Sequence, residues 1–142
     1  MLYDNALILG VLAEAYQLTK LPQYKRIVHE TMRFIQREML TAEGAFYSAL
    51  DADSEGVEGK FYTWSKAEIE TVLGADAPFF LNYFQVTQDG NWAEGAHETP
   101  ASNILWAAQY ATENEQIKIE EARQKLMEVR AKRIRPQLDD KI

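Results

Sequence analysis

The order of apolar and polar residues predicts two different helices at the start of the chain. In residues 5–19, apolar side chains occupy almost every side of a helix, and Asp4 before them is a residue type that favours a helix start. Residues 22–37 instead place apolar side chains on one stripe and charged side chains opposite, which is typical of a surface helix. Together they predict an αα-hairpin over residues 4–40 with an inner and an outer helix.

The pattern then changes to that of short strands. Residues 45–50 and 60–64 are rich in aromatic residues and flank an acidic turn that contains glycine, at 51–59. Aromatic and β-branched residues bounded by turn residues are typical of paired strands. We therefore expect one β-hairpin over residues 45–64, inserted between helices.

The next segment, residues 65–111, predicts short helices and a long ordered loop. Ser65 followed by Glu68 is the sequence of a capping box, and Gly74 suits the end of the helix that the box opens. Residues 76–83 can form another helical turn or two. Glycines and a proline follow, so we expect a long ordered loop over residues 86–111, with a strand or turn at 103–106.

A second capping box predicts the last helix. Thr112 and Glu115 open it, apolar residues recur at a spacing of three and four, and we expect the helix over residues 113–135. Pro136 ends it and leaves an extended tail at 136–142. The sequence thus predicts a mainly α fold in a single domain, 1–142.

Composition limits the classes of function. The chain has 142 residues and no cysteine, which excludes disulfides, thiolate metal sites, iron–sulfur clusters and a cysteine nucleophile. A net charge of −7 argues against nucleic acid or an anionic membrane as a partner. The longest apolar run is too short to cross a bilayer, and no basic signal segment begins the chain, so a cytoplasmic location is expected. No phosphate-binding or zinc-binding motif is present, and we expect no cofactor and no metal site.

The acidic turn is the strongest chemical feature. Asp51, Asp53, Glu55 and Glu58 could share a proton, bind sugar hydroxyls or bind a cation, and the two aspartates are the candidate catalytic residues. The alternative is that aspartate and glycine occur here because they suit turn geometry. An EF-hand is not expected, since Tyr62 stands at the twelfth loop position, where a bidentate glutamate belongs.

Aromatic side chains beside carboxylates are typical of saccharide sites, where rings stack on the apolar faces of sugars. Tyr47, Tyr62 and Trp64 flank the acidic turn and are candidate ligand-binding residues. The alternative is that these rings pack the hairpin onto the helices. His29 lies opposite the apolar stripe of its helix, and His97 lies in a polar loop without a second histidine for metal binding.

Four blocks of the sequence, in this order and spacing, resemble one family. They are MLYDNAL at 1–7, GAFYSALDADSEG at 44–56 followed by EGKFYTW at 58–64, NIL at 103–105, and RIRP at 133–136 with DDK at 139–141. They resemble the large YyaL-type proteins, relatives of spermatogenesis-associated protein 20. The middle block is the most specific of the four.

This resemblance implies a piece of an (α/α)6 toroid, similar to N-acylglucosamine 2-epimerase and the six-hairpin glycosidases. The family's thioredoxin-like domain and the remaining hairpins of the toroid would lie outside this chain. Tyr3 and Asp4 would then face the central cavity as further ligand-binding residues. No position here matches the histidine that epimerases of the similar fold use for proton transfer.

Three functions remain open at this stage. The resemblance favours a carbohydrate-binding or carbohydrate-processing module that is inactive as this piece alone, and whether it is an enzyme is left open. A non-catalytic scaffold or interaction domain is the alternative, and a cation-binding module is a third. A partial toroid leaves inner-helix surface uncovered, so we also expect self-association.

Overall fold

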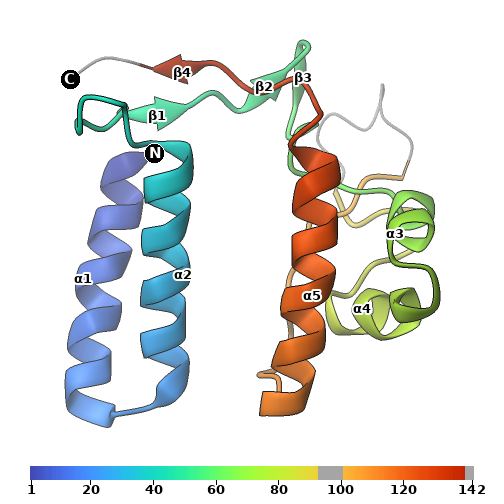
Figure 1. The fold of residues 1–142 in the computed structure, drawn as a ribbon, viewed down its shortest axis with the longest axis horizontal. Helices are drawn as coiled ribbons and strands as arrows, with labels where there is room; N and C mark the ends of the chain where they lie inside the picture. Colours follow the sequence, from blue (N-terminus) through green and yellow to red (C-terminus); the bar gives the residue numbers. More distant parts are fainter. Residues whose placement is uncertain (93–100, 140–142) are drawn as a thin grey trace. The chain divides into compact units, whose positions relative to one another are not determined.

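The computed structural model describes residues 1–92 and 101–139, and these form two compact units that are described separately. The first unit contains Met1–Asp51 and the residues from Gln137 onward, and the second contains Ala52–Pro136. Figure 1 labels their elements. The protein is mainly helical, as predicted, with two short pairs of strands.

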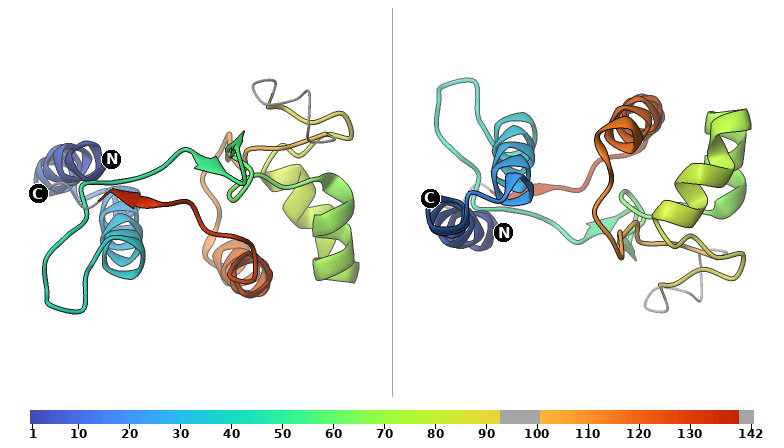
Figure 2. Two further views of the ribbon diagram at one scale, coloured as in Figure 1. Left: turned by 90° about the horizontal axis from the view of Figure 1, so that it is seen from above. Right: turned by 90° about the horizontal axis from the view of Figure 1, so that it is seen from below.

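The first unit is built on a helical hairpin. Helices α1 (Leu2–Thr19) and α2 (Pro22–Glu38) lie side by side in Figures 1 and 2. Between them Lys20 adopts a left-handed conformation with φ of 57°, and its N–H donates to the carbonyl of Tyr16 at 2.9 Å. The two helices fall where the hydrophobic pattern predicts them.

The start of α1 differs from the prediction. The helix begins at Leu2, with Met1 at the N-cap position and no side-chain capping bond, so the prediction of Asp4 as the N-cap is wrong. Asp4 lies in the first turn instead, where a carboxylate is stabilised by the exposed N–H groups of the helix start.

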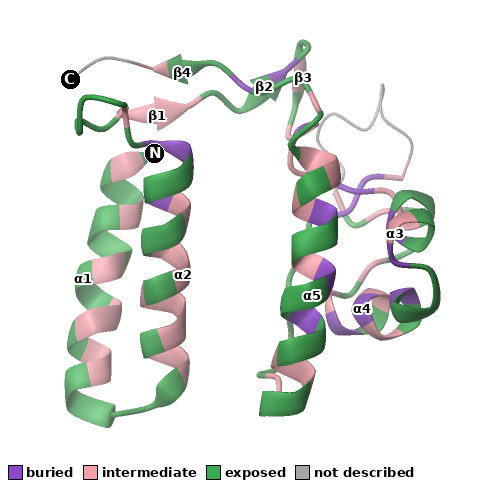
Figure 3. Ribbon diagram, viewed as in Figure 1, coloured by how far each residue is buried: buried purple, intermediate pink, exposed green. Residues whose placement is uncertain are grey.

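Helix α1 has one packed side and one open side. Half-buried residues recur at a spacing of three and four on the side packed against α2, at Leu2, Asn5, Leu9, Leu12 and Tyr16. None of the residues of α1 is fully buried, as Figure 3 also shows. Within the described residues, no helix has both the length and the apolar character that a bilayer crossing requires. The cytoplasmic location stays a prediction.

The predicted β-hairpin over residues 45–64 is wrong in its pairing. Strand β1 (Ala49–Leu50) pairs antiparallel with β4 (Leu138–Asp139), near the far end of the sequence. The backbone N–H of Asp51 extends this ladder to the carbonyl of Gln137 at 2.8 Å. The tail therefore satisfies the backbone groups that the prediction had assigned to residues 60–64.

The acidic turn forms a tighter hairpin of its own in the second unit. Strands β2 (Asp53–Ser54) and β3 (Val57–Glu58) pair antiparallel, so that only two residues connect them. Both connecting residues have positive φ, 56° at Glu55 and 76° at Gly56, as a type I′ turn requires. Glycine adopts this conformation without strain, which explains Gly56 at the second position.

Three helices complete the second unit: α3 (Lys66–Leu73), α4 (Ala77–Tyr83) and α5 (Glu113–Arg130). A short 3-10 segment, η1 (Gly74–Asp76), follows α3. Both predicted capping boxes are confirmed. In the second, hydrogen bonds from Thr112 hold the pKa of Glu115 below its ordinary value.

The last helix is shorter than predicted. It ends at Arg130 rather than near residue 135, because the following residues interact with the β2–β3 segment instead of continuing the helix. The carbonyl of Ile134 accepts a hydrogen bond from the hydroxyl of Ser54 at 2.6 Å. These contacts bring the end of α5 beside the acidic hairpin.

The core of the second unit lies where α3, α4 and α5 meet. Its buried members are apolar and come from all three helices and from the segment before α3: Trp64, Ile69, Leu73, Ala77, Phe80, Ala122 and Leu126. The buried residues on the packed side of α5 are visible in Figure 3. This core holds the end of α5 and the segment around Trp64 in fixed positions, and the candidate site is built on them.

Candidate functional site

A pocket of about 470 Å³ lies beside the acidic hairpin, entirely within the second unit. We call it the hairpin pocket. Its walls come from β2, the segment before α3, the start of α3 and the residues after α5. Most of the residues that line it carry a hydroxyl, carboxylate or cationic group, and Phe61 and Ile134 are apolar. The lining residues are Ser54, Glu55, Lys60, Phe61, Thr63, Ser65, Glu68, Ser102, Lys132, Arg133 and Ile134.

Arg133 fixes the wall of the pocket. Its guanidinium Nη1 donates to the carbonyl oxygens of Lys60, Phe61 and Thr63, at 3.3, 3.0 and 2.7 Å. Its Nη2 donates to Glu68 Oε1 at 3.2 Å, and the guanidinium lies 4.1 Å from the centre of the Trp64 ring. A planar fork with several donors is suited to such a role, whereas a lysine has only one nitrogen to offer.

Glu68 has two tasks at the same place. Its Oε2 accepts from the backbone N–H and the hydroxyl of Ser65, at 2.8 and 2.9 Å, and completes the capping box of α3. Its Oε1 accepts from Arg133. The helix start and the arginine therefore position one another, and both of these carboxylate oxygens already have a donor.

Glu55 is the predicted site residue that lines the pocket. Its carboxylate pairs with Lys60 Nζ at 2.8 Å, and both side chains are about 40% exposed. An exposed pair of this kind contributes little to folding stability, about 0–1 kcal/mol. Both groups can therefore exchange partners with a ligand at small cost.

The other acidic residues of the turn lie outside the pocket lining. Asp53 and Glu58 are exposed and stand opposite one another on β2 and β3. Like charges at directly opposite positions destabilise a strand pair. Asp51 is exposed and belongs to the first unit, so it is described apart from them.

The aromatic candidates are placed unequally. Trp64 is 3% exposed and packs in the core, and its backbone pairs with Asn103. Tyr62 is half-buried, with its ring edge-on to Phe61 and the Arg130 guanidinium 5.4 Å from its centre. Only Tyr62 of this pair keeps surface that a ligand could reach.

The remaining candidates belong to the first unit. Tyr3 and Asp4 are exposed on α1, and Tyr47 is half-buried before β1. His29 is exposed on α2, as its position opposite the apolar stripe predicts, and His97 lies outside the described residues. Among the residues that the structure describes, no three His, Cys, Asp or Glu side chains are placed to hold a metal ion.

The sequence presents Arg130, Lys132, Arg133 and Arg135 as a possible anion-binding patch, but basic residues at a helix C-terminus also complement the helix dipole, and that explanation was preferred. Sequence reasoning did not connect Lys132 and Arg133 with the acidic turn. Two of the blocks that carry the family resemblance contain these residues: Arg133 lies in RIRP and Lys60 in EGKFYTW. Their occurrence in blocks of the same family was the signal that could have indicated a common site.

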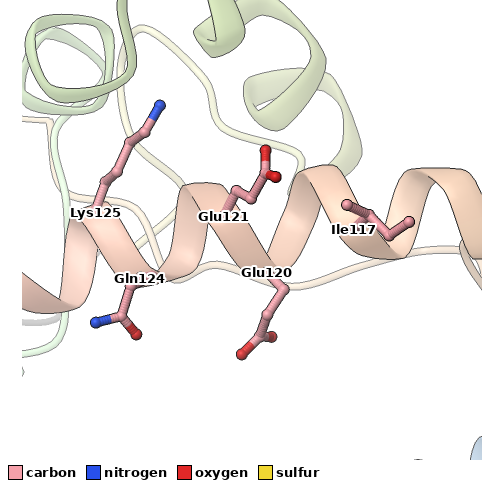
Figure 4. A pocket seen from close by; sticks show the side chains of 5 residues that line it. All are labelled: Ile117, Glu120, Glu121, Gln124 and Lys125. Carbon is pink, nitrogen blue, oxygen red and sulfur yellow. The ribbon is translucent and has the colours of Figure 1, made fainter.

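A second hollow lies along α5, at about 640 Å³. Its five lining residues all come from this one helix, and Figure 4 shows their side chains extending in different directions: Ile117, Glu120, Glu121, Gln124 and Lys125. The Lys125 amine already pairs with Asp76 at 3.1 Å. This surface lacks the converging polar groups of the hairpin pocket.

The chain is distantly similar to one group of known proteins. Spermatogenesis-associated protein 20 from Homo sapiens is 28% identical over the whole chain, and the protein of that name from Mus musculus is 27% identical. An uncharacterized protein of Caenorhabditis elegans, B0495.5, is 30% identical. The chain spans only 22–23% of the length of these relatives. No family model matches it.

Proposed function

We propose that this chain is part of a toroid of αα-hairpins and serves as a carbohydrate-binding module, with the hairpin pocket as its site. The observation that carries the proposal is the pocket lining, in which hydroxyl, carboxylate and ammonium groups surround one half-open pocket. Sugar hydroxyls both donate and accept hydrogen bonds, so they require such a mixture. The toroid is part of the proposal and rests on the helical hairpin and the family resemblance.

The size of the pocket is consistent with a small saccharide. Its volume of about 470 Å³ lies within the range of about 300–1,000 Å³ that small-molecule sites occupy. Ser54, Thr63 and Ser102 are among the residues that line it. Tyr62, at the neighbouring position in the sequence, is the ring in this segment with surface left for stacking on a sugar face.

The proposal concerns binding first. Asp51 and Asp53 stay candidate catalytic residues, and Tyr3, Asp4 and Tyr47 stay candidate contacts of a complete toroid. Of the acidic residues, Glu55 is the one with a defined place in the pocket. A reaction would need further groups from the longer protein, and the whole protein's activity is outside the proposal.

Calorimetric titration tests the binding. We expect glucose, N-acetylglucosamine or cellobiose to bind the purified chain, and Glu55→Gln to weaken that binding roughly fivefold, because a charge-assisted hydrogen bond is lost. Glu120→Gln, on the open surface of α5, is the matched control and should leave the affinity unchanged. Calcium is titrated in parallel to test the cation-binding alternative.

Two results would overturn the proposal. If none of the three sugars binds the wild-type chain, the pocket is not a saccharide site. If a sugar binds but Glu55→Gln and Glu120→Gln behave alike, the site lies elsewhere on the molecule.

A scaffold function is the second candidate, and the open side of α1 favours it. Tyr3, Leu7, Val11 and Leu18 lie on one stripe of the helix and are 58, 67, 67 and 87% exposed. A contiguous exposed apolar stripe of this kind is typical of an interaction surface, whereas the solvent-facing side of a helix is usually polar. We propose that a second copy of this chain covers the stripe when the purified chain is concentrated.

A further inference from the structure

The basic residues near the hairpin pocket differ in the contacts that their charged groups make. Four basic residues follow one another closely at the end of α5, namely Arg130, Lys132, Arg133 and Arg135. The guanidinium groups of Arg130 and Arg135 lie 5.5 Å from the centre of the Phe61 ring. That of Arg133 is occupied by three carbonyl oxygens and Glu68.

Lys132 differs from these three arginines. It lines the pocket and is exposed, and its ammonium group forms no salt bridge or cation–π contact with any residue that the structure describes. Its backbone N–H completes the last turn by donating to the carbonyl of Val129 at 3.1 Å. The ammonium group is therefore held at the rim of the pocket by a fixed backbone and remains available to a ligand.

The carboxylates of the pocket do not balance this charge. Glu55 is paired with Lys60, and Glu68 with Arg133. Once these two pairs are matched, the lining carries one positive charge in excess, on Lys132. A ligand that brings one negative charge would complete the set, whereas a neutral ligand would leave the ammonium group to water.

We propose that the hairpin pocket selects a sugar that carries one anionic group, a carboxylate or a phosphate, and that Lys132 is the residue that recognises this group. The inference rests on the proposed carbohydrate-binding function and names the ligand class of the same site. Hydroxyl groups of the sugar would meet Glu55 and the serine and threonine side chains, and its anionic group would meet Lys132. The whole chain carries a net charge of −7, which repels an anionic sugar at long range. The selectivity therefore depends on close contact between Lys132 and the anionic group.

The test compares three ligands on the intact chain. Glucuronate and glucose 6-phosphate are titrated beside glucose at low salt, which separates the carboxylate from the phosphate as the preferred group. We expect at least one of the charged sugars to bind roughly ten times more tightly than glucose, as a charge-assisted contact predicts. The preference should shrink in 0.5 M salt, where exposed charges are screened.

Variants assign the preference to one residue. Lys132→Gln should remove the difference in affinity between charged and neutral sugar, whereas Lys132→Arg should keep most of the difference. Lys25→Gln is the matched control, since Lys25 is an exposed lysine of the first unit. Thermal unfolding of each variant checks that the exposed substitutions leave the fold intact.

The outcomes separate this inference from the proposed function. Equal binding of glucose and both charged sugars, or a preference that survives Lys132→Gln, overturns the inference and leaves the carbohydrate-binding proposal standing. If none of the three ligands binds, both are overturned. A preference that disappears in Lys132→Gln and persists in Lys25→Gln supports the inference.

Discussion

Asn103 is the single polar residue on which the local structure of the second unit depends most. It has no exposed surface, and its side-chain amide donates to the carbonyls of Trp64, Thr87 and Ala101, each at 3.2 Å. Its Oδ1 accepts from the Thr87 N–H at 2.9 Å. One side chain thus ties together three segments, of which the Trp64 segment is also joined to Asn103 by a backbone β-bridge.

We expect Asn103→Asp to lower the free energy of unfolding by about 3 kcal/mol, because a buried carboxylate cannot donate to the carbonyls that surround it. Urea denaturation followed by circular dichroism measures the change. Asn82→Asp, at an exposed position of α4, is the control and should shift stability by less than about 0.5 kcal/mol. A loss at position 103 no larger than in this control would refute the role assigned to Asn103.

The residue scale also shows what the sequence could indicate about the site. Glu55 was predicted because acidic residues beside aromatic ones are visible in one short window. Lys132 and Arg133 were noted as basic residues but not linked to the acidic turn, because only the fold brings Arg133 to Lys60 and Glu68 and places Lys132 in the same pocket. Ligand binding and packing both remained open for Trp64, because alternation in a short strand does not reveal which face is buried.

At the scale of elements, the capping box of α5 makes stability depend on pH. Hydrogen bonds from Thr112 lower the pKa of Glu115 below its ordinary value of 4.5 in the folded chain. The ionised side chain therefore stabilises α5 at pH values above 4.5, and this contribution is lost as the pH falls through the lowered value.

We expect Glu115→Gln to lower the urea midpoint at pH 7 and to reduce the further loss that the wild-type chain shows between pH 5 and pH 3. Glu121→Gln, on an exposed position of the same helix, should change neither. If the urea midpoints of the wild-type chain and of Glu115→Gln fell equally between pH 5 and pH 3, the ionised Glu115 cap would not contribute to the pH dependence of stability.

Elements with local signals were predictable, and elements with distant partners were not. Both capping boxes lie within four consecutive residues, so the starts of α3 and α5 can be read directly from the sequence. The pairing of β1 with β4 joins residues 49–50 to residues 138–139 through two-residue strands, which are too short to show alternation. The predicted partner of β1 was the nearest aromatic segment, and this proximity was misleading.

At the scale of the whole molecule, the open stripe of α1 leads to a prediction about assembly. We expect the purified chain to associate with itself in the micromolar range, because burying Leu7, Val11 and Leu18 removes apolar surface from water. Light scattering coupled to size-exclusion chromatography measures the mass across a concentration series.

The variant Leu7→Glu combined with Val11→Glu should convert the associated species to monomer. Ile117→Glu, which adds a charge at a similarly exposed apolar position of α5, should not. A monomer at every concentration tested would remove the scaffold candidate in the form proposed here.

The central claim, that the hairpin pocket binds a saccharide, is tested most directly by mapping the bound ligand. Backbone amide resonances of the ¹⁵N-labelled chain are recorded while glucose and glucuronate are added to millimolar concentrations. Our account predicts shifts gathered at the pocket, around Glu55, Thr63 and Arg133, and unchanged resonances along α1. Resonances unchanged throughout, or shifts confined to α1 or to the open surface of α5, would contradict it.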